Sequence, residues 1–193
     1  MPANSRVNRV RQTGEMMDLG SRLRCVLVIA ALLVTAAVQP YWFTNDPDYY
    51  RALYRLVGER ADRQFPMGSF LRAGVAVAGG SDYPVSPPPD PLLAIQRGVL
   101  RRDPTAEIEN TELWPEEAVD VETMIAAFTI AGARANALED ETGSLEPGKS
   151  ADLVVLSEDI LDLPPERIHE SEVRLTLFRG APVFAAAEYE DLG

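Results

Sequence analysis

The first long apolar stretch of the chain predicts a buried strand. Residues 25–38 read CVLVIAALLVTAAV without a charged side chain, and a continuous apolar run is typical of a parallel strand that is covered on both faces. The arginine-rich flank ahead of it also resembles the start of a signal peptide. At 14 residues, the run is shorter than the roughly 20 residues that a membrane-spanning helix needs. We favour a strand at its end, with export or membrane anchoring as the alternative.

Helical spacing of apolar residues predicts four helices after this strand. Asp120 is the expected N-cap of the longest one, because an Asp side chain can accept a hydrogen bond from the first turn. One face of that helix is expected to hold the side chains Val121, Met124, Ile125, Phe128, Ala131, Ala135 and Leu138. The four predicted helices cover residues 48–57, 66–73, 91–101 and 121–138.

Short β elements alternate with these helices and then follow them. The sequence VAVA at 75–78 predicts a short buried strand, and residues 151–156 predict another, followed by a loop at Pro164-Pro165. Alternating polar and apolar residues at 172–178 lead into a turn and a second strand, as in a hairpin. Strands that alternate with helices favour a parallel α/β sheet, and the β-rich end favours a small separate β unit. Residues 188–193 are expected to be frayed.

Charge and composition exclude several classes of protein. The chain has 18 basic and 30 acidic residues, a net charge of −12, so we expect no nucleic-acid partner, because phosphate contacts need an excess of Lys and Arg. Residues 1–102 carry a net charge of +5 and residues 103–193 one of −17, which we interpret as a solvated acidic face. A single cysteine, Cys25, excludes an intrachain disulfide, and a single histidine, His169, excludes a site built from several imidazoles of this chain.

One stretch of the sequence is a candidate for an active site. The predicted strand at 75–78 runs into Gly79-Gly80-Ser81-Asp82, which places a carboxylate at the carboxyl end of a buried strand, where α/β proteins have their active sites. An Asp there can bind a metal or accept a proton from a metal-bound water. The other interpretation is an ordinary turn in which Asp82 caps the next helix, and residue type alone favours that interpretation.

From about Val34 to Phe184, the chain resembles the C-terminal part of metal-dependent amidohydrolases of the family 3 type. The most specific stretch runs from Leu138 to Leu156, with Gly143, Gly148, Ala151 and Asp152 in a spacing that is hard to reach by chance. Shorter matches support the resemblance: Val38-Gln39-Pro40-Tyr41, Ala73-Gly74-Val75 leading to Gly80-Ser81-Asp82-Tyr83-Pro84-Val85, and Phe128-Thr129-Ile130 through Leu138.

The resemblance implies the fold, which is the C-terminal portion of a (β/α)8 TIM-type barrel followed by strands of a small β-sandwich. A complete barrel takes about 250 residues, so the barrel in this chain is expected to be incomplete. We expect residues 34–142 to hold the last barrel strands and helices, and residues 143–187 the sandwich strands. Residues 1–33 stay unassigned, since no resemblance was found there.

The resemblance also implies an activity, which is metal-dependent hydrolysis of a carbon–nitrogen bond in a small amide-type substrate. The metal would be divalent, with zinc favoured, and Asp82 would be the catalytic carboxylate and the one metal-ligand candidate. The candidates for a substrate pocket are Gln39, Tyr41, Trp42, Ser81 and Tyr83. Catalytic zinc needs three protein ligands, so this chain alone is expected to bind no metal and to be inactive.

Two further residues are expected to be structural. His169 falls in the connection between the predicted sandwich strands, and Asp152 at a strand start is expected to pair with backbone donors.

Two parallel strands cannot close a barrel, so we expect the chain to self-associate. An alternative of another class is a non-catalytic fragment, membrane-associated or secreted through residues 25–38. We favour a cytoplasmic protein and little membrane contact.

Overall fold

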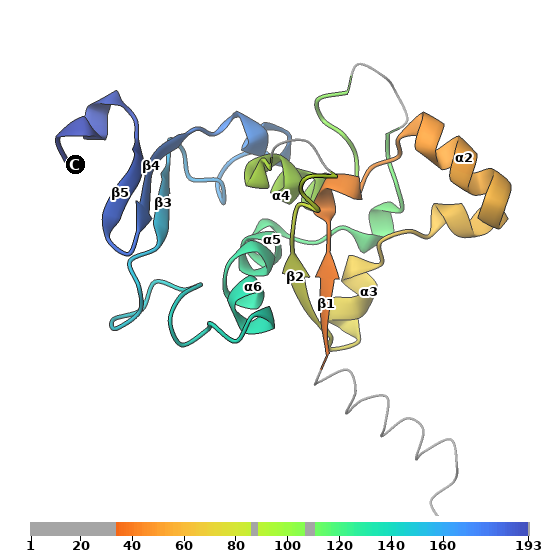
Figure 1. Ribbon diagram of the computed structural model, residues 1–193. Helices are drawn as coiled ribbons and strands as arrows, with labels where there is room; N and C mark the ends of the chain where they lie inside the picture. The colour runs from red at the N-terminus through yellow and green to blue at the C-terminus, as the bar shows by residue number, and fades with distance from the viewer. Residues whose placement is uncertain (1–33, 86–88, 107–110, 193) are drawn as a thin grey trace, which may run out of the picture.

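The chain forms two separate sheets with helices between them. The computed structural model describes residues 34–85, 89–106 and 111–192 (Figure 1). Strands β1 (Thr35–Val38) and β2 (Ala76–Gly79) pair in parallel, with Thr35 opposite Ala76 and Val38 opposite Gly79. Strands β3 (Leu153–Leu156), β4 (Val173–Phe178) and β5 (Ala181–Ala185) form an antiparallel sheet in the order β3-β4-β5. Figure 1 shows α4, α5 and α6 between the two sheets.

The helices are short, and several connections are single turns of 3₁₀-helix. None of the helices in the described residues has both the length and the apolar character needed to cross a membrane. The α-helices are α2 (Pro47–Val57), α3 (Met67–Arg72), α4 (Pro91–Leu100), α5 (Val121–Phe128) and α6 (Ile130–Ala135). The 3₁₀-helices are η1 (Pro40–Trp42), η2 (Gly58–Asp62), η3 (Pro115–Glu117), η4 (Pro165–Glu170) and η5 (Ala187–Leu192).

The core lies where the parallel strands meet the helices. Strand β2 packs against α3, α5 and α6, and α4 packs against α5, η1 and η4. These contacts bury apolar side chains from β1, α3, β2, α4, α5 and η4, which explains why short elements with few internal hydrogen bonds are stable together. The buried cluster consists of Val38, Phe43, Met67, Val77, Ile95, Met124, Ala127 and Ile168.

Most of the elements predicted from the sequence are confirmed. The end of the apolar run 25–38 forms β1, and the rest of that run lies outside the described residues. The helices predicted at 48–57, 66–73 and 91–101 correspond to α2, α3 and α4. The strand at 75–78 and the three β elements after residue 150 are also present, with a tight turn between β4 and β5. Local spacing was therefore sufficient to place these elements.

The prediction of one helix over 121–138 is wrong. The helix breaks at Thr129, which has φ −122° and ψ −99°, and its hydroxyl donates a hydrogen bond of 2.7 Å to the Ile125 carbonyl. A threonine hydroxyl that bonds back to the preceding turn competes with the backbone ladder and bends or interrupts a helix. The second helix, α6, ends at Ala135. As a consequence, Ala135 and Leu138 are exposed rather than part of a continuous apolar face.

Two loop predictions also need correction. The loop predicted at Pro164-Pro165 continues into the 3₁₀-helix η4, for which Pro165 supplies a preset φ at the first position. The frayed end predicted for 188–193 is a 3₁₀-helix up to Leu192, while residue 193 lies outside the described residues. That helix is held to the sheet because the Ala186 N–H donates to the Arg174 carbonyl at 2.7 Å.

A fully buried guanidinium joins three segments of the α/β part. Arg101 follows α4 with a positive φ of 54°, and none of its surface is exposed. Its side chain donates to the backbone carbonyls of Leu113 at 3.0 Å, Gln64 at 3.0 Å and Phe65 at 3.3 Å, and it lies 4.4 Å from the ring centre of Phe43. Burial lowers the pKa of Arg101 to about 10, so the group stays protonated at neutral pH.

A buried carboxylate holds α3 against η3. Glu117 accepts hydrogen bonds from the Ser69 N–H at 2.6 Å, the Ser69 hydroxyl at 2.5 Å and the Arg72 guanidinium at 2.8 Å. Burial would raise the pKa of Glu117, but these hydrogen bonds and the charge of Arg72 outweigh it, so the pKa lies below its ordinary value of 4.5. The carboxylate is therefore ionised wherever the protein is folded at neutral pH.

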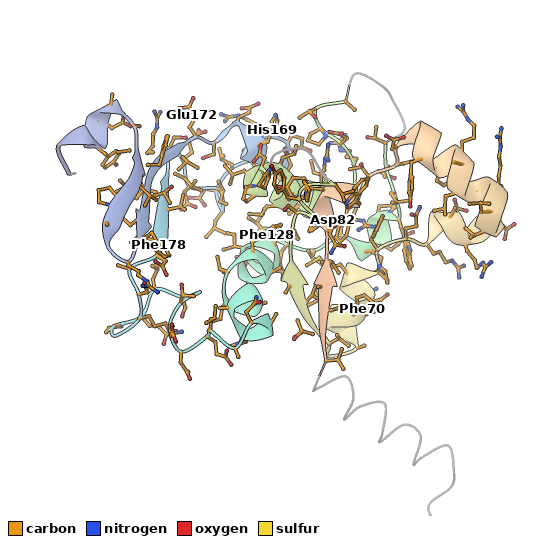
Figure 2. The ribbon with its side chains drawn as sticks, viewed as in Figure 1. Phe70, Asp82, Phe128, His169, Glu172 and Phe178 are labelled. Carbon is orange, nitrogen blue, oxygen red and sulfur yellow. The ribbon has the colours of Figure 1, made fainter. Side chains whose placement is uncertain are left out.

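The connection between β3 and β4 ties the antiparallel sheet to α4. Gln96, which is fully buried, donates from its side-chain amide to the Pro165 carbonyl at 2.7 Å, and Ile168 enters the core. His169 lies in the same 3₁₀-helix, as expected for a residue in this connection. Its Nδ1 atom is buried and has no hydrogen-bond partner among the described residues. Figure 2 shows His169 on η4, above α4.

One face of the antiparallel sheet exposes three large apolar side chains next to Thr176 and Arg174. Val154, Thr176 and Phe184 lie opposite one another across the three strands, and Phe178 follows two residues after Thr176 on the same face. The exposed fractions are 53% for Val154, 50% for Phe184 and 56% for Phe178. Figure 2 shows Phe178 on this sheet, away from the helices. Apolar side chains gathered in this way mark a surface that another layer can cover.

Arg101→Met should destabilise the protein by about 3–5 kcal/mol, because it removes the donor from three carbonyls, one of them buried and two part-buried. The measurement is urea unfolding followed by circular dichroism. The control is Arg102→Met at the next residue, whose pair with Glu166 is exposed at both side chains and should be worth about 1 kcal/mol or less. Equal losses for the two variants would contradict the role given to Arg101.

The open sheet face predicts that the chain self-associates, as the sequence suggested. Phe184→Lys should weaken the association at least about tenfold, since it removes roughly 1.5–3 kcal/mol of burial per ring and adds a charge. Sedimentation velocity at several concentrations measures this. The control is Leu56→Lys, because Leu56 on α2 is 81% exposed and outside the sheet. A monomeric wild-type chain at every concentration would refute the prediction.

Candidate functional site

The parallel strands end side by side and place Asp82 beyond that edge. The Gly80 N–H donates to the Val38 carbonyl at 2.9 Å, which extends the pairing one residue past β2. Asp82 then adopts a positive φ of 58°, and its carbonyl accepts a hydrogen bond from the Val85 N–H at 2.8 Å. Figure 2 shows Asp82 at the end toward which both strands point. Because the side chain is exposed, the carboxylate can be reached from outside.

The segment after β2 is a turn, but Asp82 does not cap the next helix. The cap of α4 is Asp90, whose carboxylate accepts hydrogen bonds from the Leu92 and Leu93 N–H groups. Ser81 is also committed to the turn, since its hydroxyl oxygen accepts from the Tyr83 N–H at 3.2 Å. The alternative in which Asp82 is a helix cap is therefore wrong.

A glycine lets α5 approach the end of β2. A Cβ atom at Gly79 would lie 2.9 Å from an atom of the Phe128 ring, closer than real Cβ contacts allow. The next residue, Gly80, has open space, since its nearest neighbour would be the Val38 carbonyl oxygen at 4.0 Å. Figure 2 shows Phe128 on α5 beside β2. The first glycine of the pair is thus required by packing, directly ahead of the turn that presents Asp82.

The end of β1 leads into η1, which carries two of the predicted pocket residues. Tyr41 is 6% exposed, and its carbonyl accepts a hydrogen bond of 2.8 Å from the Arg97 guanidinium. Burial, together with the charge of Asp90, raises the pKa of the Tyr41 hydroxyl. Trp42 is half-buried, and its backbone N–H donates to the Gln39 carbonyl at 3.0 Å.

The predicted site residues separate into two groups. Tyr41 and Trp42 line a cavity of about 190 Å³ next to α2 and α4. Gln39, Ser81, Asp82 and Tyr83 are not among the residues that line it, and Tyr83 is 64% exposed. The cavity also contains side chains that the sequence analysis did not select, among them Tyr49, Tyr50, Phe65, Arg97 and Asp103. The adjacent residues Tyr49 and Tyr50, which follow the turn at Asn45-Asp46, were the sequence signal from which these additional cavity residues could have been predicted.

The described residues do not form a complete metal centre. Within residues 34–85, 89–106 and 111–192, no three His, Cys, Asp or Glu side chains are grouped as metal ligands would be. A catalytic zinc has three protein ligands, and Asp82 offers one carboxylate. His169 belongs to η4, which packs on α4. The donor set therefore does not fit a divalent metal, and no step through a metal follows from it.

Comparison with known proteins identifies the family. The model of the amidohydrolase family matches residues 6–184. The chain belongs to that family. The matched range begins within the N-terminal segment for which the sequence analysis found no resemblance, and it ends at Phe184 in β5. Family membership rests on most of the chain rather than on the loop around Asp82.

Curated relatives agree with this assignment. A Bacillus subtilis protein named as the amidohydrolase YtcJ is 30% identical to this chain over 156 residues. These residues are 80% of this chain and 28% of YtcJ. An N-substituted formamide deformylase of Arthrobacter pascens is 34% identical over 119 residues, which are 60% of this chain and 20% of that enzyme. The matched part of this chain thus spans less than a third of the length of each of these relatives.

A solved structure supports the fold. An uncharacterized metal-dependent hydrolase from Pyrococcus horikoshii superimposes with a TM-score of 0.50 at 24% identity, over 68% of this chain and 26% of that protein. At this identity the likeness concerns the fold alone. The mixed α/β architecture of this member of the amidohydrolase family is accordingly related to the TIM barrel.

Gly79→Ala should cost about 1–3 kcal/mol, the usual range for overpacking, because the new methyl group meets the Phe128 ring. Gly80→Ala is the matched control, since the same methyl group enters open space there. The midpoints of urea unfolding of the two variants measure the difference. A loss at Gly80 as large as that at Gly79 would show that chain flexibility, not the ring contact, sets the requirement.

Proposed function

We propose that this chain supplies Asp82 to an active site that hydrolyses a carbon–nitrogen bond, other than a peptide bond, in a small molecule. The observation that carries the proposal is the exposed carboxylate on a tight turn directly after a buried parallel strand. This edge of a parallel sheet is where α/β proteins bind their substrates. The family supports it too, since its relatives include proteins named as a deformylase and as deaminases.

In this proposal, Asp82 acts on protons. The carboxylate accepts a proton from the attacking water and delivers it to the nitrogen that leaves when the carbon–nitrogen bond breaks. A positioned acid–base group of this kind typically contributes about 10²–10⁴-fold to the rate. The turn holds the group by backbone contacts, because the Asp82 carbonyl is bonded to the Val85 N–H. The carboxylate itself is thereby left for the substrate side.

We further propose that β1 and β2 are the last two strands of a barrel and that β3 to β5 belong to the accessory sandwich. The remaining ligands of a divalent metal, zinc in our proposal, then come from polypeptide beyond the described residues. This agrees with a chain that spans 28% of YtcJ, and with the size of a complete barrel of about 250 residues. The chain by itself is then inactive.

The test joins this chain to the barrel of a relative. Residues 34–184 replace the part of YtcJ that they match, and hydrolysis of N-substituted formamides and other amides is measured. Asp82→Asn in this hybrid should lower kcat by about 10²–10⁴. The control is Asp162→Asn, an equivalent change at an exposed residue after β3.

Two results would count against the proposal. One is an active hybrid that is indifferent to Asp82→Asn, which would remove the carboxylate from the chemistry. The other is a purified 193-residue chain that binds about one zinc and loses it on Asp82→Ala, which would place a complete site within this chain. A hybrid that folds but hydrolyses none of the amides would favour the alternative, a non-catalytic fragment.

A further inference from the structure

The cavity beside η1 is lined by aromatic residues from three parts of the chain. Among the described residues, Tyr41 and Trp42 come from η1, Tyr49 and Tyr50 from the start of α2, and Phe65 from the segment after η2. The volume of the cavity is about 190 Å³. An engineered protein cavity of about 150 Å³ holds benzene, so this cavity has room for one six-membered ring with a small substituent.

Phe65 holds its ring in the cavity wall from a backbone conformation that phenylalanine rarely adopts. Its φ is 58°, in the left-handed region that disfavours bulky side chains. The Arg101 guanidinium keeps the segment in this conformation, because it donates to the Gln64 carbonyl at 3.0 Å and to the Phe65 carbonyl at 3.3 Å. Phe43 stacks on one face of the Phe65 ring, with ring centres 5.4 Å apart. The part of Phe65 that lines the cavity is therefore the surface that Phe43 leaves uncovered.

The opposite wall is continuous. The rings of Trp42 and Tyr49 contact each other, with their centres 6.4 Å apart and their planes at 48°, so a ligand ring has no room between them. Tyr49 is 51% exposed, which places it at the mouth of the cavity. Because the Trp42–Tyr49 pair is closed, a bound ring has to lie in the space that Phe65 lines.

The charged side chains of the cavity are engaged within the protein. The Arg97 guanidinium lies 2.5 Å from the Asp103 carboxylate and also donates to the Tyr41 carbonyl at 2.8 Å. The Asp46 carboxylate accepts a hydrogen bond from the Tyr49 N–H at 2.9 Å and takes part in a further interaction. A charged ligand would therefore give up its water without gaining an uncompensated opposite charge, which is unfavourable. The lining thus favours an uncharged ligand.

We propose that the cavity binds a small molecule through an uncharged aromatic ring, which packs against Phe65. Aromatic rings prefer offset-stacked or edge-to-face contacts with one another, and the fixed Phe65 ring offers such a contact in a space of the right size. The orientation of this ring does not depend on the ligand, because Phe43 and Arg101 hold Phe65 from behind.

This binding site goes beyond the function proposed for Asp82 and does not rest on it. Asp82 is not among the residues that line the cavity, and binding can be measured on the chain without turnover. The two proposals can therefore fail independently.

The test uses four ligands of similar size on the full chain. Benzamide is aromatic and neutral, benzamidine is its cationic analogue, benzoate its anionic analogue, and cyclohexanecarboxamide is neutral without an aromatic ring. The chain has two tryptophans, so Trp114→Phe leaves Trp42 as the fluorescent reporter in the cavity. We expect benzamide to bind with a dissociation constant of about 1 mM. Benzamidine and benzoate should each bind at least about tenfold more weakly, and cyclohexanecarboxamide about 2- to 10-fold more weakly.

Phe65→Leu isolates the ring contact. It removes the aromatic ring but keeps an apolar side chain, so benzamide binding should weaken about 2- to 10-fold while cyclohexanecarboxamide binding changes little. Phe65→Tyr keeps the ring and should retain the preference for benzamide. The matched control is Phe70→Leu, because Phe70 on α3 is also half-buried against the core but does not line the cavity. It should alter the binding of neither ligand.

Ala106→Phe tests the cavity without removing any of its contacts. Ala106 lines the cavity and is half-buried, so the added ring should occupy the space and abolish benzamide binding. The matched control is Ala118→Phe, the same change at an exposed residue that follows η3 and lies outside the cavity. This variant should bind benzamide like the wild type.

Four outcomes would overturn the inference. If benzamidine or benzoate binds as tightly as benzamide, the cavity does not select an uncharged ligand. Equal binding of benzamide and cyclohexanecarboxamide would show that apolar volume, and not an aromatic ring, is recognised. Benzamide binding that persists in Ala106→Phe would place the ligand elsewhere. No binding of any of the four ligands, by Trp42 fluorescence and by saturation-transfer nuclear magnetic resonance, would show that the cavity is not a site for a ring of this size.

A far-ultraviolet circular dichroism spectrum equal to that of the wild type certifies each variant. If Phe65→Leu does not fold, the comparison of Ala106→Phe with Ala118→Phe, together with the order of the four ligands on the otherwise unchanged chain, decides the question.

Discussion

The burial of one positive charge organises the α/β part of this protein. A guanidinium removed from water is costly unless its donors find acceptors, and Arg101 finds the carbonyls of Gln64, Phe65 and Leu113. Those acceptors belong to the segment after η2 and to the acidic segment before η3, which are far apart in sequence. The guanidinium lies on Phe43, and Phe43 stacks on Phe65, which lines the cavity beside η1. The side chain that carries the buried charge therefore also supports one wall of that cavity.

The uneven charge of the chain is also partly structural. The basic first half and the acidic second half were interpreted as leaving a solvated acidic face. Among the described residues, three ion pairs cross between these halves, namely Arg72–Glu117, Arg97–Asp103 and Arg102–Glu166. In the first, the carboxylate is 2% exposed, whereas both partners of the third are open to solvent. The pairs thus range from a buried anchor to a surface contact worth little, and part of the acidic excess serves to hold the halves together.

The elements could be predicted because their signals are local. Asp120 accepts from the Thr123 N–H as an N-cap should, and Gly74 has the positive φ expected after a helix. The break at Thr129 was missed because the spacing of apolar residues is indifferent to a hydroxyl that bonds to a carbonyl four residues back. Tyr41 and Trp42 were among the pocket candidates and do line the cavity, but Arg97 was missed for another reason. Arg97 and Tyr41 are 56 residues apart and meet only in the folded chain, so no local pattern in the sequence relates them.

The stretch that most specifically resembles the family, from Leu138 to Leu156, has a structural role. Asp152 accepts hydrogen bonds from the Arg179 N–H at 2.7 Å and from the Thr142 hydroxyl at 3.0 Å, and the backbone hydrogen bond lowers its pKa. This confirms the structural role predicted for it. Gly143 has φ +88°, and a Cβ there would lie 2.6 Å from that of Ala133. Both residues hold the return from α6 to β3, away from Asp82. Backbone geometry of this kind tolerates few substitutions, so the stretch that most resembles the family is fixed by the needs of the fold rather than by the chemistry proposed for Asp82.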